Sequence, residues 1–313
     1  MKKLLVAVLV GLMMASTAYA KKITIGYTFH SAQDVFQNLL KNEFVKAAEE
    51  KGVKVRVIDP LMDIEKQAAA IETFITLGVD AIVCSPLDYE GAIPGVMAAN
   101  KAGIPYVAVN SEIGGDGNFV YVGSLNYDAG VIEGEYMGKV LPENAKILYL
   151  RGTEGMEHTI ARRKGIQDAL LDKRTDVELL TEQTAKFDRA EGMRVMEDWI
   201  QKYPEIHGVI SANDQMALGA LEALKGAGIE GVLIAGIDGT TEAKQNVKNG
   251  TFAITVLQDA EGQATTALQA ALDLIEGKEI EKRIIVPFRP ITKENIDQYM
   301  HCLLYTSPSP RDA

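Results

Sequence analysis

The feature that most constrains the fold of this chain is a regular alternation of short aliphatic segments with longer helical ones. Two aliphatic segments, 81–86 (AIVCSP) and 232–239 (VLIAGIDG), are almost continuously apolar, which is typical of strands buried on both faces of a parallel sheet. Helical stretches at 35–52, 65–78 and 89–103 each end at the glycine expected just beyond a helix. The pattern predicts an α/β fold with right-handed βαβ crossovers.

The candidate strands are too numerous for one compact open sheet. We therefore predict two Rossmann-like lobes in tandem, with parallel sheets that divide near residues 119–130. Periodicity alone does not tell how often the chain passes between the lobes. The candidate strands are 23–28, 53–59, 81–86, 106–110, 119–123, 146–152, 177–183, 208–213, 232–239, 252–258 and 283–287, and the last long helix is expected at 261–277.

The two ends of the chain differ from the rest. Residues 1–20 combine a positive start (MKK), an apolar run shorter than the ~20 residues that span a bilayer, and a small-residue cleavage site (AYA). They predict a secretory signal peptide and an exported protein, the alternative being a membrane anchor. Residues 301–313 change character abruptly, so we expect a non-native tail, with a genuine disordered terminus as the alternative.

Charge and cysteine usage exclude several classes of function. The net charge is −11, which argues against nucleic acid and anionic membranes as partners. Cys84 and Cys302 are the only cysteines, and the second lies in the doubtful tail. With no CxxC or Cys/His cluster, we expect no metal site and no cofactor. The chain also lacks the P-loop, GxSxG and HExxH motifs of common enzyme classes.

Polar residues end six of the candidate strands. In α/β sheets, ligands bind beyond the carboxyl ends of strands, so these side chains are candidates to surround a cleft. Asn213 has an alternative role as a helix cap, because it precedes the helical run MALGALEAL. The six residues are Thr28, Ser85, Asn110, Asn213, Asp238 and Gln258.

Several longer runs resemble one known family. They are 85–111 (SPLDYEGAIPGVMAANKAGIPYVAVNS), 187–224 (which contains SANDQMALGALEAL), 234–250 (IAGIDGTTEAKQNVKNG) and 255–259 (TVLQD). Together they are similar to the bacterial periplasmic sugar-binding proteins of the ribose/galactose type, the solute receptors of ATP-binding-cassette importers. The resemblance extends over about residues 22–298 and implies the type I periplasmic binding protein fold, two lobes joined by a hinge.

The resemblance also implies roles for particular residues. Asn213 and Asp238 match ligand-binding positions of the second lobe, and Gln258 matches an amide at the hinge. The matched arginine is Arg162, a few residues before Gly165. Aromatic residues that cover sugar faces match Phe36 and Phe187, while Thr28, Ser85 and Asn110 occupy polar positions of the first lobe.

The first lobe departs from the family pattern. Ribose receptors carry an acidic and a basic residue where this chain has Asn110 and Ser111, and Val35 stands where a second aromatic is common. The resemblance therefore does not specify ribose. Since the charges of Arg162 and Asp238 cancel, we expect a neutral monosaccharide or polyol rather than an anion. A cyclitol or a furanosyl signalling molecule is the alternative ligand.

The histidines are scattered along the sequence. We expect His30, His158 and His207 to be surface or packing residues rather than catalytic bases.

Two other classes of protein remain as alternatives to a receptor. A sugar-modifying periplasmic enzyme would need a nucleophile or an acid–base pair that the strand ends do not offer. A repressor-type regulator of the same fold would need a DNA-binding segment where the signal peptide stands.

The resemblance also implies a domain division and partners. We expect a first lobe of residues 22–124 plus 259–287 and a second lobe of residues 125–258 plus 288–300. The expected partner is the membrane permease of an ATP-binding-cassette importer, with a chemoreceptor as a further possibility. We expect a monomer in the periplasm.

Overall fold

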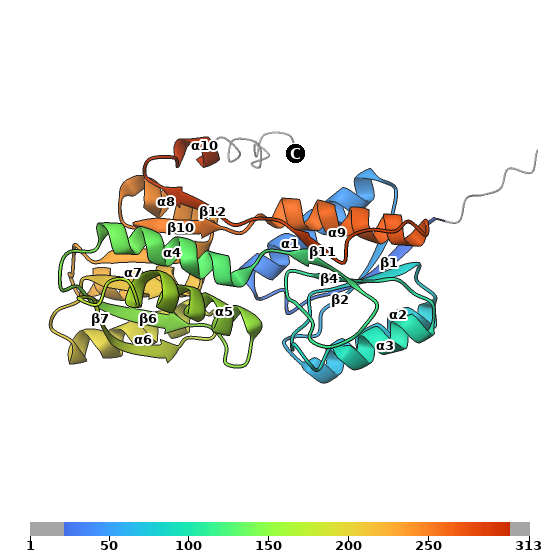
Figure 1. The fold of residues 1–313 in the computed structure, drawn as a ribbon, viewed down its shortest axis with the longest axis horizontal. Helices are drawn as coiled ribbons and strands as arrows, with labels where there is room; N and C mark the ends of the chain where they lie inside the picture. The colour runs from blue at the N-terminus through green and yellow to red at the C-terminus, as the bar shows by residue number, and fades with distance from the viewer. Residues whose placement is uncertain (1–21, 301–313) are drawn as a thin grey trace, which may run out of the picture.

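The computed structural model describes residues 22–300, which form two bodies side by side along the longest axis (Figure 1). Each body consists of one six-stranded sheet with flanking helices. We call the body that contains the first strand the first lobe and its neighbour the second lobe. The predicted signal peptide, the predicted tail and Cys302 lie outside the described residues.

The first lobe has the strand order β2-β1-β3-β4-β5-β11. Helices α1 and α9 cover one face of this sheet and α2 and α3 cover the other, which gives two separate apolar clusters. The strands are β1 (Thr24–Thr28), β2 (Lys54–Ile58), β3 (Ala81–Cys84), β4 (Tyr106–Val109), β5 (Val120–Gly123) and β11 (Arg283–Ile285). The helices are α1 (Val35–Glu50), α2 (Ile64–Leu77), α3 (Ile93–Lys101) and α9 (Ala260–Ile275).

The second lobe repeats this plan with the strand order β7-β6-β8-β9-β10-β12. Its strands are β6 (Lys146–Arg151), β7 (Glu178–Thr184), β8 (Gly208–Ser211), β9 (Leu233–Asp238), β10 (Ile254–Leu257) and β12 (Arg289–Thr292). Its helices are α4 (Asn126–Val140), α5 (Glu157–Ile166), the π-helical turn η1 (Gln167–Leu171), α6 (Arg189–Lys202), α7 (Asp214–Gly226), α8 (Thr241–Asn249) and α10 (Asp297–Met300).

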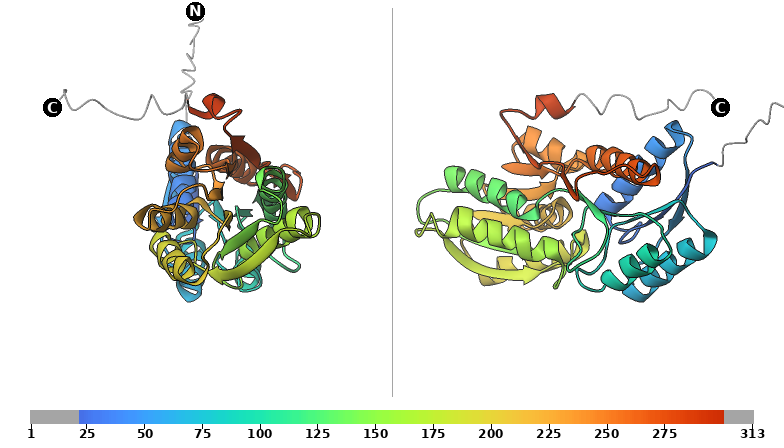
Figure 2. Two further views of the ribbon diagram at one scale, coloured as in Figure 1. Left: turned by 90° about the vertical axis from the view of Figure 1, so that its left-hand side faces the viewer. Right: turned by 45° about the vertical axis from the view of Figure 1, so that its right-hand side comes forward.

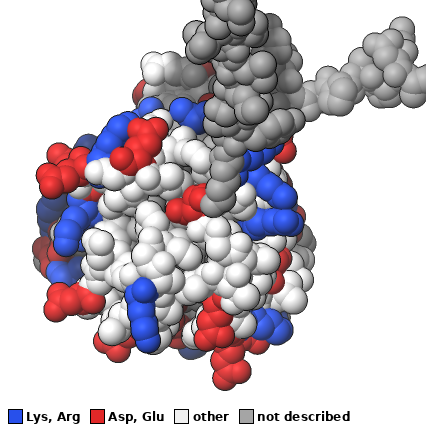
Figure 3. Space-filling view, turned by 90° about the vertical axis from the view of Figure 1, so that its right-hand side faces the viewer, with Lys and Arg blue, Asp and Glu red and all other residues white. Residues whose placement is uncertain are grey.

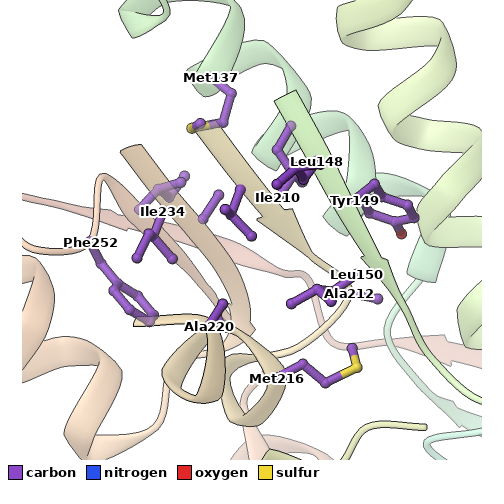
Figure 4. Packing of buried hydrophobic residues seen from close by; sticks show 14 of the residues in the cluster. Met137, Leu148, Tyr149, Leu150, Ile210, Ala212, Met216, Ala220, Ile234 and Phe252 are labelled. Carbon is purple, nitrogen blue, oxygen red and sulfur yellow. The ribbon is translucent and has the colours of Figure 1, made fainter. Parts of the chain in front are cut away.

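The core of the second lobe is one continuous apolar cluster. Met137 of α4 and Met216 and Ala220 of α7 lie on opposite sides of strands β6, β8 and β9 (Figure 4). These central strands are therefore buried on both faces, as their continuous apolar sequences predict.

The α/β prediction is confirmed, and all eleven predicted strands are present. Within residues 22–300, the described strand pairs are parallel except β10 with β12. Strand β12 was not predicted from the sequence. It is a short edge strand that contains Pro290, a residue that edge strands tolerate. The helix predicted at 89–103 is wrong at its start. It begins at Ile93, because Asp88 instead accepts hydrogen bonds from the amides of Glu90 and Gly91 and closes a turn.

In residues 22–300 the chain passes between the lobes three times, from β5 to α4, from β10 to α9 and from β11 to β12. The crossing segments lie close together beside the junction of the two lobes (Figure 2). Both sheets share the order 2-1-3-4-5 for their first five strands, so each has a switch point beside its first strand, where α/β proteins bind ligands.

No helix in the described residues is long and apolar enough to cross a membrane. Figure 3 views the end of the first lobe, where acidic and basic residues alternate around a largely uncharged centre and form no basic patch on that face.

Helices α4 and α5 pack so closely that a test of the fold follows. A Cβ at Gly130 would overlap the backbone carbonyl of Arg162, whereas a Cβ at Gly138, two turns further along α4, would make ordinary contact with Leu170. We expect Gly130→Ala to reduce the free energy of unfolding by about 1–3 kcal/mol, as overpacking does. Gly138→Ala should leave stability unchanged or raise it by up to ~1 kcal/mol through helix propensity. Urea unfolding measures both, and equal effects would contradict the close packing.

Candidate ligand-binding cleft

A cavity lies at the junction of the two lobes. Its free space is about 340 Å³, including the part that opens to solvent. The lining residues come from both lobes: His30, Asp34, Phe36, Gln37, Asn110, Met156, His158, Arg162, Phe187, Asn213, Asp238 and Gln258.

Seven of the nine residues singled out in the sequence line this cavity: Phe36, Asn110, Arg162, Phe187, Asn213, Asp238 and Gln258. Thr28 and Ser85 do not line it. Thr28 is fully buried at the end of β1, and its hydroxyl has no hydrogen-bond partner. Ser85 is also fully buried, and its hydroxyl lies 3.4 Å from Nε2 of His30. Ser85 therefore supports a cavity residue instead of facing the cavity.

Asn213 both caps a helix and faces the cavity. Its Oδ1 accepts a hydrogen bond of 3.0 Å from the amide of Met216, which caps α7. Its Nδ2 lies 3.4 Å from the carbonyl of Phe187. Capping fixes the side chain at the end of β8, so the amide is held in place before any ligand arrives.

Arg162 is the central cation of the cavity and is only 3% exposed. Its Nε donates to Oδ1 of Asn126 at 3.0 Å, one terminal nitrogen donates to the carbonyl of Ala212 at 2.6 Å, and the other donates to Oε1 of Gln258 at 3.1 Å. The guanidinium also lies 5.9 Å from the ring centroid of Phe288, within cation–π range. These contacts fix the plane of the guanidinium on three sides.

Buried carboxyl groups surround Arg162. Burial raises the pKa of Asp238 well above its ordinary value, while Arg162 opposes this change. Burial also raises the pKa of Glu133, again opposed by Arg162, and neither carboxyl oxygen of Glu133 has a partner at hydrogen-bond distance. Burial also raises the pKa of Asp214 to about 6, although hydrogen bonds from Thr240 and Thr255 lower it.

Two cavity residues at the start of α1, Asp34 and Gln37, were not predicted from the sequence. Asp34 is the N-cap of this helix, and its Oδ1 accepts from the amide of Gln37 at 3.0 Å. The cap places the side chain of Asp34 and the first turn of α1 at the cavity. An acidic residue directly before an amphipathic helix is a cap signal that could have been noticed.

A chain of hydrogen bonds fixes the orientation of the buried amides in the first lobe. The carbonyl of Val286 can only accept, so the hydroxyl of Ser124 donates its proton to it. The oxygen of the same hydroxyl then accepts from Nε2 of Gln263. Oε1 of Gln263 then accepts from Nδ2 of Asn110 at 3.2 Å, and Oδ1 of Asn110 accepts from Nε2 of Gln37 at 2.8 Å. Each amide has one possible orientation, and Oε1 of Gln37 remains as an acceptor without a partner.

His30 and His158 line the cavity, which corrects the expectation that they are surface or packing residues. Their rings meet edge to face, with centroids 6.0 Å apart, across the junction of the lobes. Nε2 of His30 lies 3.0 Å from the carbonyl of Pro86 and therefore donates to it. Nε2 of His158 lies 3.3 Å from Oδ1 of Asn110, a direct contact between the lobes. His207 is a half-buried residue elsewhere, and its Nδ1 accepts from the amide of Lys146.

Two aromatic rings flank the cavity. Phe36 is buried at the start of α1, and Phe187 is half-buried after β7. The ring of Phe187 lies over Gly152 so closely that a Cβ there would overlap it. A glycine at position 152 is therefore required for the observed position of the ring.

The backbone is strained at three cavity residues. Asn110, Phe187 and Asp238 have φ values of 68°, 59° and 129°, in regions that non-glycine residues rarely adopt and that cost about 1–3 kcal/mol each. Such strain tends to gather at binding sites, and here all three strained residues line one cavity.

Two buried amide atoms at the cavity have no partner within the protein. They are Oε1 of Gln37, on the first lobe, and Nε2 of Gln258, at the second crossing. Buried polar groups are nearly always hydrogen-bonded, so a ligand with both donors and acceptors would satisfy them. Residues 22–300 contain no cluster of three or more His, Cys, Asp or Glu residues that could hold a metal ion.

Comparison with known proteins agrees with this geometry. A family model described as a periplasmic binding protein domain matches residues 25–279. The chain belongs to this family. It is 33% identical over 309 residues to a Rhizobium meliloti protein whose name assigns it rhizopine binding, an alignment that covers 96% of this chain and 99% of the relative.

Two further proteins are similar to this periplasmic binding protein. It is 32% identical to the ribose import binding protein of Bacillus subtilis, over 88% of each chain. Among solved structures, it resembles a solute-binding protein of an ABC transporter from Bacillus halodurans with bound myo-inositol. That structure has a TM-score of 0.85 and 33% identity, and the match covers 90% of this chain and 99% of that one. The family resemblance and the fold predicted from the sequence are confirmed.

The buried histidine His158 gives this binding protein a testable pH dependence. Burial, followed by the charges of Arg162 and His30, holds the pKa of His158 well below its ordinary value of 6.5. As the pH falls through about 6.5, the unfolded chain therefore binds a proton before the folded chain does, and stability is lost. We expect the melting temperature to fall less between about pH 7.5 and 5.5 in His158→Gln than in the unchanged protein.

Differential scanning fluorimetry at both pH values measures this difference. The buried carboxyl groups titrate in the opposite sense in both proteins, so the comparison isolates His158. An equal loss in the two proteins would show that His158 is not held neutral.

Proposed function

We propose that this protein is a periplasmic solute receptor that binds one small sugar or polyol between its lobes and delivers it to an ATP-binding-cassette permease. The observation that carries the proposal is the cavity itself, where unpartnered amide atoms of Gln37 and Gln258 accompany Arg162 and Asp238. The relatives named above are binding proteins for rhizopine, ribose and myo-inositol, and none is an enzyme by name.

The chemistry of the cavity suits a polyhydroxyl ligand. Each hydroxyl both donates and accepts, so it can pair with a carboxylate, an amide or a guanidinium. Asp238 offers a carboxyl group, Gln258 a free donor and Gln37 a free acceptor. The rings of Phe36 and Phe187 supply apolar surface for the C–H faces of a sugar ring. With a single cation among the lining residues, the cavity does not favour an anionic ligand.

Binding between two lobes supplies the mechanism of the receptor. A ligand that contacts both lobes stabilises the closed arrangement over any open one by the difference in its contacts. The bodies that move are residues 22–124 with 259–287 and residues 125–258 with 288–300, and the three crossings form the hinge. The permease recognises the closed form. This role requires export, which the predicted signal peptide would provide, and a monomer suffices for it. A chemoreceptor could recognise the same closed form.

A thermal-shift screen tests this function. Because a ligand that binds only the folded state raises its stability, we expect at least one compound among pentoses, hexoses, polyols, inositols and amino sugars to raise the melting temperature. Amino acids and sugar phosphates serve as controls. A response to amino acids or phosphates alone would contradict a sugar or polyol receptor.

Asp238 is the side chain whose loss should matter most among the acceptors. We expect Asp238→Ala to fold and to bind the best compound from the screen at least tenfold more weakly, about 1.4 kcal/mol. Asp198→Ala is the matched control, since Asp198 is 66% exposed on α6 of the same lobe. Titration calorimetry gives both affinities, and unchanged affinity in Asp238→Ala would remove this residue from the site.

A further inference from the structure

Carboxyl groups outnumber lysine and arginine residues in the lining of the cavity. Two carboxyl groups, Asp34 from the first lobe and Asp238 from the second, line the same small space, and Arg162 is the only Lys or Arg residue that lines it. Among the described residues, neither carboxyl group forms an ion pair within 4 Å with a lysine or arginine. Asp34 therefore adds a second carboxyl group to the pair of Arg162 and Asp238.

The part of the cavity wall formed by the first lobe also lacks free hydrogen-bond donors. The hydrogen-bond chain from Val286 uses the Nε2 of Gln37 and the Nδ2 of Asn110, so Gln37 presents only its unpartnered Oε1. Gln37 is 2% exposed, so solvent does not satisfy this oxygen. The Oδ1 of Asp34 already accepts from the amide of Gln37, and its second oxygen is a further acceptor at the cavity. Nε2 of His30 donates to the carbonyl of Pro86, which leaves Nδ1 of the neutral ring as an acceptor.

We propose that the preferred ligand is a sugar or polyol that carries a protonated amine, bound with its ammonium group at the acceptors Asp34 and Gln37 of the first lobe and opposite Asp238. This inference rests on the proposed function, and it narrows the ligand class within it. An ammonium group has three donors and no acceptor, so it complements a wall of acceptors better than a hydroxyl, which has one donor. Hydrogen bonds between charged partners are also roughly twice as strong as neutral ones.

Electrostatics within the cavity agree with this assignment. Burial is the main cause of the raised pKa of Asp238, and Arg162 opposes it. The charges of Asp214 and then of Asp34 raise this pKa further, so Asp34 and Asp238 act on each other across the junction of the lobes. A cation between them would remove this repulsion and favour the closed arrangement of the lobes. A neutral ligand would leave the repulsion in place.

Matched ligand pairs test the proposal. Each pair differs in one hydroxyl replaced by an amine: glucose with glucosamine, galactose with galactosamine, and myo-inositol with an amino-inositol. N-acetylglucosamine is the uncharged control for the nitrogen substituent. By titration calorimetry at neutral pH, we expect the amine of the best-bound pair to bind at least tenfold more tightly than its hydroxyl partner.

Asp34→Asn tests the residue assignment. Asparagine caps a helix as well as aspartate does, so this variant removes the charge and keeps the start of α1. We expect the tenfold preference for the amine to fall below threefold. Asp63→Asn is the matched control, because Asp63 caps α2 of the same lobe in the same way but lies outside the cavity. It should leave the preference unchanged.

The outcomes separate this inference from the proposed function. Hydroxyl ligands that bind as tightly as their amine partners, or a preference that survives Asp34→Asn, would overturn the inference and leave the receptor function in place. If no member of any pair and no compound of the wider screen binds, the sugar or polyol receptor itself is contradicted.

Discussion

The hydrogen bonds of one buried guanidinium connect the hinge of this protein to its cavity. Arg162 donates to Asn126 just after the first crossing and to Gln258 at the second, and it lies over the ring of Phe288 at the third. The residue therefore contacts all three segments that join the lobes while it lines the space between them. Buried charges are costly unless they are hydrogen-bonded, so the position of Arg162 holds only while these segments stay in place. A ligand that engages Arg162 is thus coupled physically to the geometry of the hinge.

The first lobe holds its cavity side chains in a different way. Beside Asp34, its cavity wall contains neutral amides whose orientation is set by a hydrogen-bond chain that ends at Val286, beside the third crossing. The carbonyl of Val286 therefore determines which end of each amide faces the ligand, because each amide in the chain has one donor end and one acceptor end. The two lobes therefore share a fold but differ in chemistry, with the buried Arg162 at the centre of one and an oriented amide network beside Asp34 in the other.

The sequence predicted the fold and most of the second-lobe site for identifiable reasons. Asn213, Asp238 and Gln258 lie at or just beyond the carboxyl ends of aliphatic strands, and the order of strands in an α/β sheet brings such positions to one edge. Asp34, Gln37 and the two cavity histidines were missed because they lie in a loop and on a helix, where sequence periodicity says nothing about direction. The pairing of His158 with Asn110 depends on how the lobes meet, a long-range contact that local patterns do not encode. Thr28 and Ser85 also lie at strand ends, but residues of the neighbouring loop, which contains His30, line the cavity instead.

The central claim is that a small ligand holds the two lobes together across the cavity. Small-angle X-ray scattering of the purified protein tests it most directly, with and without a saturating concentration of the compound that raises the melting temperature most. The account predicts a smaller radius of gyration with the compound bound, since contacts with both lobes favour the closed arrangement. An unchanged radius of gyration at saturation would contradict ligand-driven closure.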